Sequence, residues 1–200
     1  MPHSKQLGKE RLVFFSDAIL AIIVTILVLD IKVPIVETGG DAELTRRLIV
    51  QAPHLVAFVL SFAVIIVLWY SHNRLMEMVD RPTNTFGVIN FLFIGVTATI
   101  PFTTALVGEY PGSSVAAAML AANMLLMNIF ITLCFVYAMK KNLVGKNFVF
   151  GHYDKMKRIM GIIGTFLFLG SIFVAFLSPV VSLVMIAAVP IMHCLPIKRE

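Results

Sequence analysis

Long apolar runs alternate with short polar segments along the whole chain, and six of the runs are as long as a membrane span. A helix rises about 1.5 Å per residue, so about 20 apolar residues cross a hydrocarbon core of roughly 30 Å. No linker and no internal repeat interrupts this pattern, so we expect one all-α transmembrane domain over residues 1–200. The six predicted spans cover residues 12–31, 52–72, 86–107, 114–139, 159–177 and 179–195.

The polar segments carry the residues that start, end or bend helices. Pro34 ends the first predicted span, and Ser113 or Ser114 can cap the fourth. A short interfacial helix is expected to begin near Asp41, after a Gly-Gly turn. Pro190 is expected to bend the sixth span, because proline cannot donate the usual backbone hydrogen bond.

Composition places the chain firmly among membrane proteins. Fifty-nine per cent of the residues are hydrophobic and the mean hydropathy is +0.94, far above the values of a soluble domain. The net charge is +5, but the basic residues lie between the predicted spans and form no basic and aromatic patch, which argues against a nucleic-acid partner.

The distribution of Lys and Arg predicts the orientation in the membrane. With a cytoplasmic N-terminus, thirteen of the sixteen basic residues lie on the inner side, and Lys32, Arg46 and Arg47 are the outer three. Because inner segments of membrane proteins are enriched in Lys and Arg, we expect both termini in the cytoplasm. The predicted location is the cell's inner (plasma) membrane, with six transmembrane helices per chain.

Residues that usually build catalytic or metal centres are few and scattered. The five His residues do not have the spacing of metal ligands, and Cys134 and Cys194 fit neither a metal nor a redox pattern. We therefore expect no enzyme activity, no metal and no cofactor, and we interpret both cysteines as small apolar residues.

The first predicted span contains one carboxylate, Asp17, in an otherwise apolar run. An ionisable group at membrane depth usually faces protein or water, so the side of the helix that carries Asp17, Val24 and Val28 is expected to pack on other helices. At 100° per residue an apolar stripe lies on the other side. Periodicity alone leaves lipid, a neighbouring subunit and a pore open for this stripe, which consists of Phe15, Ile19, Ile22, Ile26 and Leu29.

Several polar side chains from three helices are predicted to lie at one depth near the inner face. Trp69 and His72 can donate hydrogen bonds to Asp17, which would offset the cost of a carboxylate in lipid. An interhelical clamp is one interpretation of this layer, and direct gating or proton sensing is the other. Arg11 lies on the opposite side of its helix from Asp17, so Glu77 or Asp80 is its expected partner. The layer consists of Ser16, Asp17, Trp69, His72 and Asn90.

Three sequence elements, in order on a six-span chain, resemble the transmembrane protein 175 family of endolysosomal potassium channels and their bacterial relatives. The family also lacks a TVGYG filter loop, and this chain contains no such sequence. The matching elements are Arg11-x-x-x-Phe15-Ser16-Asp17, Trp69-x-x-His72, and Asn90 followed by Pro101-Phe102-Thr103-Thr104.

The resemblance implies a role for the first helix. In the family, first helices from separate repeats line the conduction path, with an isoleucine constriction seven residues after the signature phenylalanine, which is Ile22 here. Ile26 and Leu29 then form further apolar rings, with the hydroxyl of Thr25 at the edge of the pore. Because one repeat is present, the resemblance implies a homotetramer. Arg11, Phe15, Ser16 and Asp17 become the packing signature near the inner mouth.

These elements together predict a leak-type potassium channel with modest selectivity over sodium. Partial dehydration at an apolar ring favours potassium, whereas no carbonyl cage replaces the hydration shell. No helix carries Arg or Lys at every third position, so voltage sensing is not expected. The alternatives are a proton-coupled secondary transporter that uses Asp17 and His72, and a structural membrane protein without transport.

Overall fold

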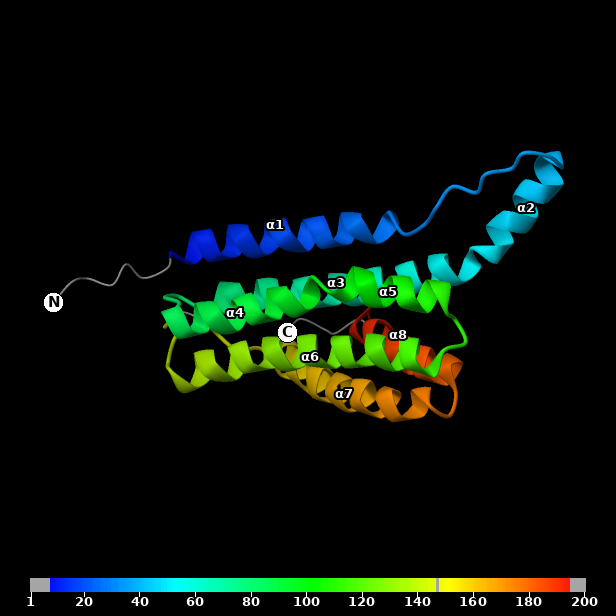
Figure 1. Cartoon of the computed structure of the whole chain (residues 1–200). Helices are drawn as coiled ribbons and strands as arrows, with labels where there is room; N and C mark the ends of the chain where they lie inside the picture. The colour runs from blue at the N-terminus through cyan, green and yellow to red at the C-terminus, as the bar shows by residue number, and fades with distance from the viewer. Residues whose placement is uncertain (1–7, 147, 195–200) are drawn as a thin grey trace.

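The chain forms a bundle of α-helices in a computed structural model that describes residues 8–146 and 148–194 (Figure 1). Within these ranges the only β-type pairing is an isolated bridge between Val79 and Val144. The eight helices of the described residues are α1 (Lys9–Val28), α2 (Gly40–Val50), α3 (Ala52–Met78), α4 (Asn84–Thr97), α5 (Ile100–Glu109), α6 (Ser114–Lys140), α7 (His152–Ala175) and α8 (Pro179–Cys194).

Five segments of the described chain are long and apolar enough to cross a membrane, so this is a multi-pass membrane protein. They are α1, α3, α4 together with α5, α6, and α7 from Asp154 onward. The sixth predicted span corresponds to α8, an apolar helix of 16 residues, which is shorter than the other five segments. The predicted end of that span at residue 195 lies outside the described residues.

Two helices extend beyond the predicted spans, because their polar end residues were assigned to loops. Helix α3 continues six residues past the predicted end at residue 72, and Leu75, Met76 and Met78 in this extension are buried. Helix α7 begins seven residues before the predicted start at residue 159. Its first turn is capped by Asp154, whose carboxylate accepts a 3.0 Å hydrogen bond from the Gly151 backbone N–H.

The third predicted span is not one continuous helix. It is interrupted between α4 and α5, which the prediction of an unbroken span over residues 86–107 missed. Pro101 has no N–H to donate to the Thr97 carbonyl and its ring crowds that carbonyl, so the interruption falls where proline predicts it. Asn123 of α6 braces this point, donating to the hydroxyls of Thr99 at 2.9 Å and Thr103 at 3.2 Å.

Two of the expected helix-start signals are confirmed, whereas α1 ends at Val28, six residues before Pro34. Ser113 caps α6, because its side chain accepts a hydrogen bond from the Ala116 backbone N–H at 3.3 Å. Helix α2 begins at Gly40, one residue before the predicted start near Asp41. Helix α8 runs through Pro190 to Cys194.

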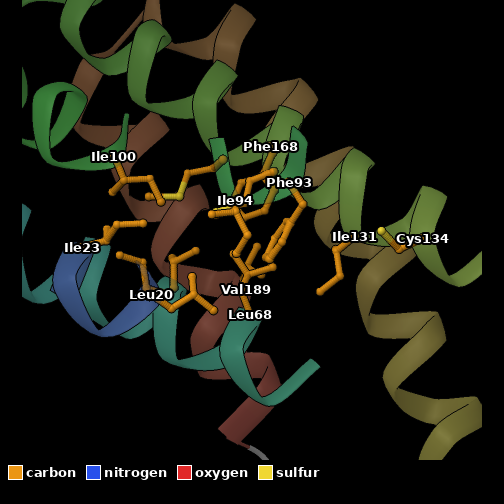
Figure 2. Packing of buried hydrophobic residues seen from close by; sticks show 14 of the residues in the cluster. Leu20, Ile23, Leu68, Phe93, Ile94, Ile100, Ile131, Cys134, Phe168 and Val189 are labelled. Atoms are coloured by element: carbon orange, nitrogen blue, oxygen red, sulfur yellow. The ribbon is translucent and has the colours of Figure 1, made fainter. Parts of the chain in front are cut away.

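Helix α1 lies along one side of the bundle, and α2 leans away from the other helices at the opposite end from the start of α1 (Figure 1). Helix α1 contacts α3, α4 and α5, while α6 packs against α4, α5, α7 and α8. Figure 2 shows Leu20 and Ile23 of α1 in the same apolar cluster as Leu68 of α3 and Ile94 of α4. The bundle therefore holds α1 by one side only.

Candidate functional site

Helix α1 has a buried side and an exposed side. The exposed side carries Ile22, Ile26 and Leu29, which are 55%, 44% and 74% exposed, together with Thr25. All four predicted pore residues thus share one uncovered face. Phe15 lies on the exposed side as well, half-exposed. The buried side consists of Leu12, Ser16, Leu20, Ile23 and Leu27.

The residues of α1 that are buried differ in part from those that were predicted to pack on other helices. Asp17 and Val24 are half-buried, as expected of that side, but Val28 is exposed. Ile19, predicted on the free stripe, is half-buried and packs against the core. Most residues of α1 are apolar on every side of the helix, so hydrophobicity gives little signal of which side meets protein.

A directed chain of hydrogen bonds joins three helices through buried side chains. The Ser16 hydroxyl donates to the Leu12 carbonyl at 2.9 Å, so it accepts from the Asn90 side-chain amide, also at 2.9 Å. The amide oxygen of Asn90 lies 2.8 Å from His72 Nε2. With the amide in this orientation, His72 must carry its proton on Nε2 and donate it. Ser16, Asn90 and His72 are each at most 1% exposed.

Stacking fixes the remaining freedom of the imidazole. The ring of His72 stacks on Phe93 of α4, with centroids 5.4 Å apart and planes 12° from parallel. Its buried Nδ1 has no hydrogen-bond partner among the described residues. The chain from His72 to Leu12 therefore ties α3 to α4 and α4 to α1 through Asn90.

A second branch ties α1 directly to α3. The indole N–H of Trp69 donates to Asp17 Oδ1 at 3.1 Å, so the predicted role of Trp69 as a donor to this carboxylate is confirmed. Phe15 adds an apolar contact on the same side of the bundle, meeting the ring of Phe91 edge-on at 5.4 Å. The five predicted layer residues thus come together, but as two separate hydrogen-bonded branches.

Two predicted contacts in this layer, one for His72 and one for Arg11, were wrong. His72 bonds to Asn90 and not to Asp17, since its Nε2 is directed at the amide. Arg11 is exposed and forms no ion pair with the described residues. Glu77, one of its expected partners, instead pairs with Arg74 at 3.0 Å, because both project from the last turns of α3.

The exposed face of α1 offers very little polar chemistry. Between Ala18 and Leu29 the one polar side chain is Thr25, and its hydroxyl donates to the Ile22 carbonyl at 2.8 Å. That bond, to a carbonyl three residues earlier, occupies the hydroxyl hydrogen within the helix itself. The face therefore offers no charged side chain that could coordinate a cation. Among the described residues, no group of three His, Cys, Asp or Glu could hold a metal ion.

Further polar clamps were missed by the sequence analysis. The Ser61 and Thr104 hydroxyls, from α3 and α5, lie 2.7 Å apart. Asn128 of α6 donates to Thr165 of α7 at 2.8 Å, and Asp154 of α7 receives two hydrogen bonds from Arg74 at 2.7 and 3.0 Å. Isolated Asn, Ser and Thr residues inside apolar runs are the signal that points to such contacts.

Comparison with known proteins begins with the first half of the chain. Residues 11–101, from α1 to the start of α5, match the family model described as endosomal/lysosomal potassium channel TMEM175. A potassium channel of Chamaesiphon minutus is 40% identical over 126 residues, which make up 60% of this chain and 60% of that protein. A potassium channel of Streptomyces collinus is 37% identical over 121 residues, 58% of each chain. The matches thus span about three fifths of these relatives.

More distant relatives and a solved structure extend the comparison. The human endosomal/lysosomal proton channel TMEM175 is 33% identical over 101 residues, which cover 48% of this chain and 20% of that protein. The crystal structure of a lysosomal potassium-selective channel TMEM175 homolog from Chamaesiphon minutus has a TM-score of 0.81 and 29% identity. It covers 94% of this chain, and this chain covers 96% of it. In its motifs, in its sequence over residues 11–101 and in its fold, the chain is similar to the TMEM175 family.

Proposed function

We propose that this protein is a leak-type potassium channel of the plasma membrane, with modest selectivity over sodium and both termini in the cytoplasm. In this proposal four copies of the chain, each one transmembrane domain over residues 1–200, surround the pore, and α1 of each copy lines it. Two bacterial relatives are named potassium channels, which supports the permeant ion. Potassium ions and lipid are then the only small-molecule partners, with no cofactor.

The uncovered face of α1 is the observation on which this proposal rests. Ile22, Ile26 and Leu29 form an apolar stripe that no other described helix covers. Lipid could also cover such a stripe, but lipid contact does not require a helix held rigidly on its other side. Two hydrogen-bonded branches and a buried apolar side hold α1 in place. A fixed rotation is what a pore-lining helix needs, because the ring diameter depends on it.

In this proposal, ion conduction and selectivity depend on apolar rings that the four copies of α1 form around the pore. Four isoleucines at one level block ions by dewetting when the ring is narrow, and admit partly dehydrated ions when it is wider. Potassium loses water more readily than sodium, so the ring favours potassium. The discrimination is modest because Ile22, Ile26 and Leu29 offer no oxygen to replace the lost water. Thr25 adds a hydroxyl oxygen at the edge of this path.

The reversal potential tests the proposal directly. In planar bilayers under a potassium and sodium gradient, the reversal potential of the purified protein should shift toward the potassium potential. Ile22→Asn should carry more current with less selectivity. Ile162→Asn is the matched control, because Ile162 lies on α7 and is 50% exposed, close to the 55% of Ile22. Equal currents and equal reversal potentials in wild type and Ile22→Asn would remove Ile22 from the path.

Proton movement is the second candidate, because the animal relatives are named proton channels. The earlier alternative of a proton-coupled transporter uses Asp17 and His72, but these two residues lie on separate branches with no hydrogen bond between them. The same bilayers under a pH gradient distinguish the candidates. A reversal potential that follows the proton gradient favours a proton channel, whereas flux that saturates and depends steeply on pH favours a transporter.

A further inference from the structure

Helix α7 exposes an apolar stripe that runs nearly its whole length. The stripe residues recur every three or four positions, so they lie on one face of the helix. The length of this face, on a helix at the periphery of the bundle, fits the hydrocarbon region of a membrane. The residues are Ile159, Ile162, Phe166, Leu169 and Phe173, each at least 40% exposed.

The same face of α7 ends in two cations. At 100° per residue Lys155 falls at the same angle as Phe173, and Arg158 lies about 60° away. Both are exposed and form no hydrogen bond or ion pair with the described residues. Lys155 lies four residues, about 6 Å, before Ile159, where the hydrocarbon region gives way to headgroups. Lys157 differs, because its ammonium donates to the His193 carbonyl at 2.8 Å.

Helix α6 repeats the arrangement at the same end of the bundle. Met119, Leu126 and Leu133 are exposed at intervals of seven residues, and the next position in that series is the exposed Lys140. Lys141 follows and is also exposed. Because α6 ends where α7 begins and the two helices pack against each other, these cations and those of α7 lie at one end of the molecule.

The connection between α6 and α7 is held against the bundle, and it presents apolar side chains beside the cations. The Asp80 backbone N–H donates to the Leu143 carbonyl at 2.9 Å, and the Arg74 guanidinium lies 4.5 Å from the Phe148 ring centroid. Val149, 82% exposed, and Phe150 project from this anchored segment. Exposed apolar residues next to cations are typical of segments that lie at a membrane surface.

Nearby carboxylates neutralise part of this charge but not all of it. Arg74 pairs with both Asp154 and Glu77, at 2.7 and 3.0 Å, so its single charge offsets only one of these two carboxylates. Asp80, exposed at the end of α3, is the third carboxylate in this part of the described chain. The cations on the stripe ends therefore keep a net positive charge at headgroup depth, which complements a phosphate group.

We infer that this end of α6 and α7 binds anionic phospholipid headgroups, with Lys155 and Arg158 contacting the phosphate and Lys140 and Lys141 adding to the attraction. The acyl chains would then lie along the exposed stripe of α7. The inference does not depend on what the protein transports, because it uses only the exposed faces of two peripheral helices and their charges.

Native mass spectrometry of the full-length protein in detergent tests the inference. Titration with phosphatidylglycerol should show tighter binding than titration with phosphatidylcholine of the same chains. The double variant Lys155→Gln, Arg158→Gln should bind phosphatidylglycerol about fivefold more weakly for each cation removed. The double variant Arg46→Gln, Arg47→Gln, at the far end of the molecule, is the matched control and should bind like wild type.

The outcomes are distinguishable. Phosphatidylglycerol binding unchanged in the Lys155 and Arg158 variant, or weakened equally in the control, would overturn the inference. Displacement of the lipid by inorganic phosphate at the same concentration would also overturn it, since a free phosphate site would then be present. Circular dichroism of both variants verifies folding, and a Lys155→Arg, Arg158→Lys variant, which keeps both charges, should retain wild-type binding.

Discussion

Replacement of Asn90 by Leu tests whether the buried chain holds α1 in place. Leu has the same branched arrangement of heavy atoms as Asn but can make none of its hydrogen bonds, so the change removes the bonds to both Ser16 and His72. Interhelical hydrogen bonds in membrane proteins contribute about 0.6 kcal/mol on average and up to about 1.7 kcal/mol. Two lost bonds predict a decrease of about 1 to 3 kcal/mol in the free energy of unfolding.

Titration with a denaturing detergent in mixed micelles measures this free energy. Asn84→Leu is the matched control, because Asn84 starts the same helix with an exposed side chain. Ser16→Ala in the Asn90→Leu background should cost less than Ser16→Ala alone, because the shared bond is already absent. An Asn90→Leu protein within about 0.5 kcal/mol of wild type, the range of ordinary surface substitutions, would refute the reasoning.

Three further predictions concern single contacts. Trp69→Phe keeps most of the ring but loses the 3.1 Å bond to Asp17, and should lower the free energy of unfolding by about 0.5 to 1.5 kcal/mol in the same titration. Gly108→Val should lower the thermal midpoint through a loss of about 1 to 3 kcal/mol, because a β-carbon at Gly108 would lie 2.6 Å from the His54 ring. In α2, hydrogen bonds from two arginines lower the pKa of Glu43 from 4.5 to about 2. A lowered pKa stabilises the folded form above the unfolded value, so this stabilisation should be complete above pH 4.5 and fade as the pH falls toward 2. Glu43→Gln should remove that dependence, as followed by helicity.

The depth of the polar layer could be predicted from the sequence, but its pairing could not. Counting residues from the ends of the spans places Ser16, Asp17 and Trp69 at one level, because the rise of a helix is constant. Whether His72 meets Asp17 or Asn90 depends on the rotation of each helix about its own axis. That rotation is set by packing between helices, which spacing along the chain does not determine.

The buried side of α1 illustrates the same limit. Ile23 is buried and Ile22 is exposed, although they are identical neighbours in an apolar run. Asp17 was the only residue that indicated which side of α1 packs on other helices. The indication was correct for Asp17, which is half-buried, but not for Val28, which is exposed. Periodicity left lipid, a neighbouring subunit and a pore open for the exposed side, and the choice of a pore came from the resemblance to a known family. In contrast, the interruption between α4 and α5 could have been predicted from the sequence, because Pro101 removes a specific backbone hydrogen bond. Residues 86–107 were nevertheless expected to form one unbroken span.

Modification of a single cysteine tests most directly whether the α1 stripes surround the ion path. The background carries Cys194→Ser, since Cys194 is exposed, and Cys134 is left in place because it is buried. Ile22→Cys and the control Ile162→Cys are compared in bilayers under a potassium gradient while silver ions are added. If α1 lines the path, silver should block the current of Ile22→Cys and leave that of Ile162→Cys unchanged. A current through Ile22→Cys that silver leaves unchanged, with the thiol shown to be modified, would contradict this role of α1.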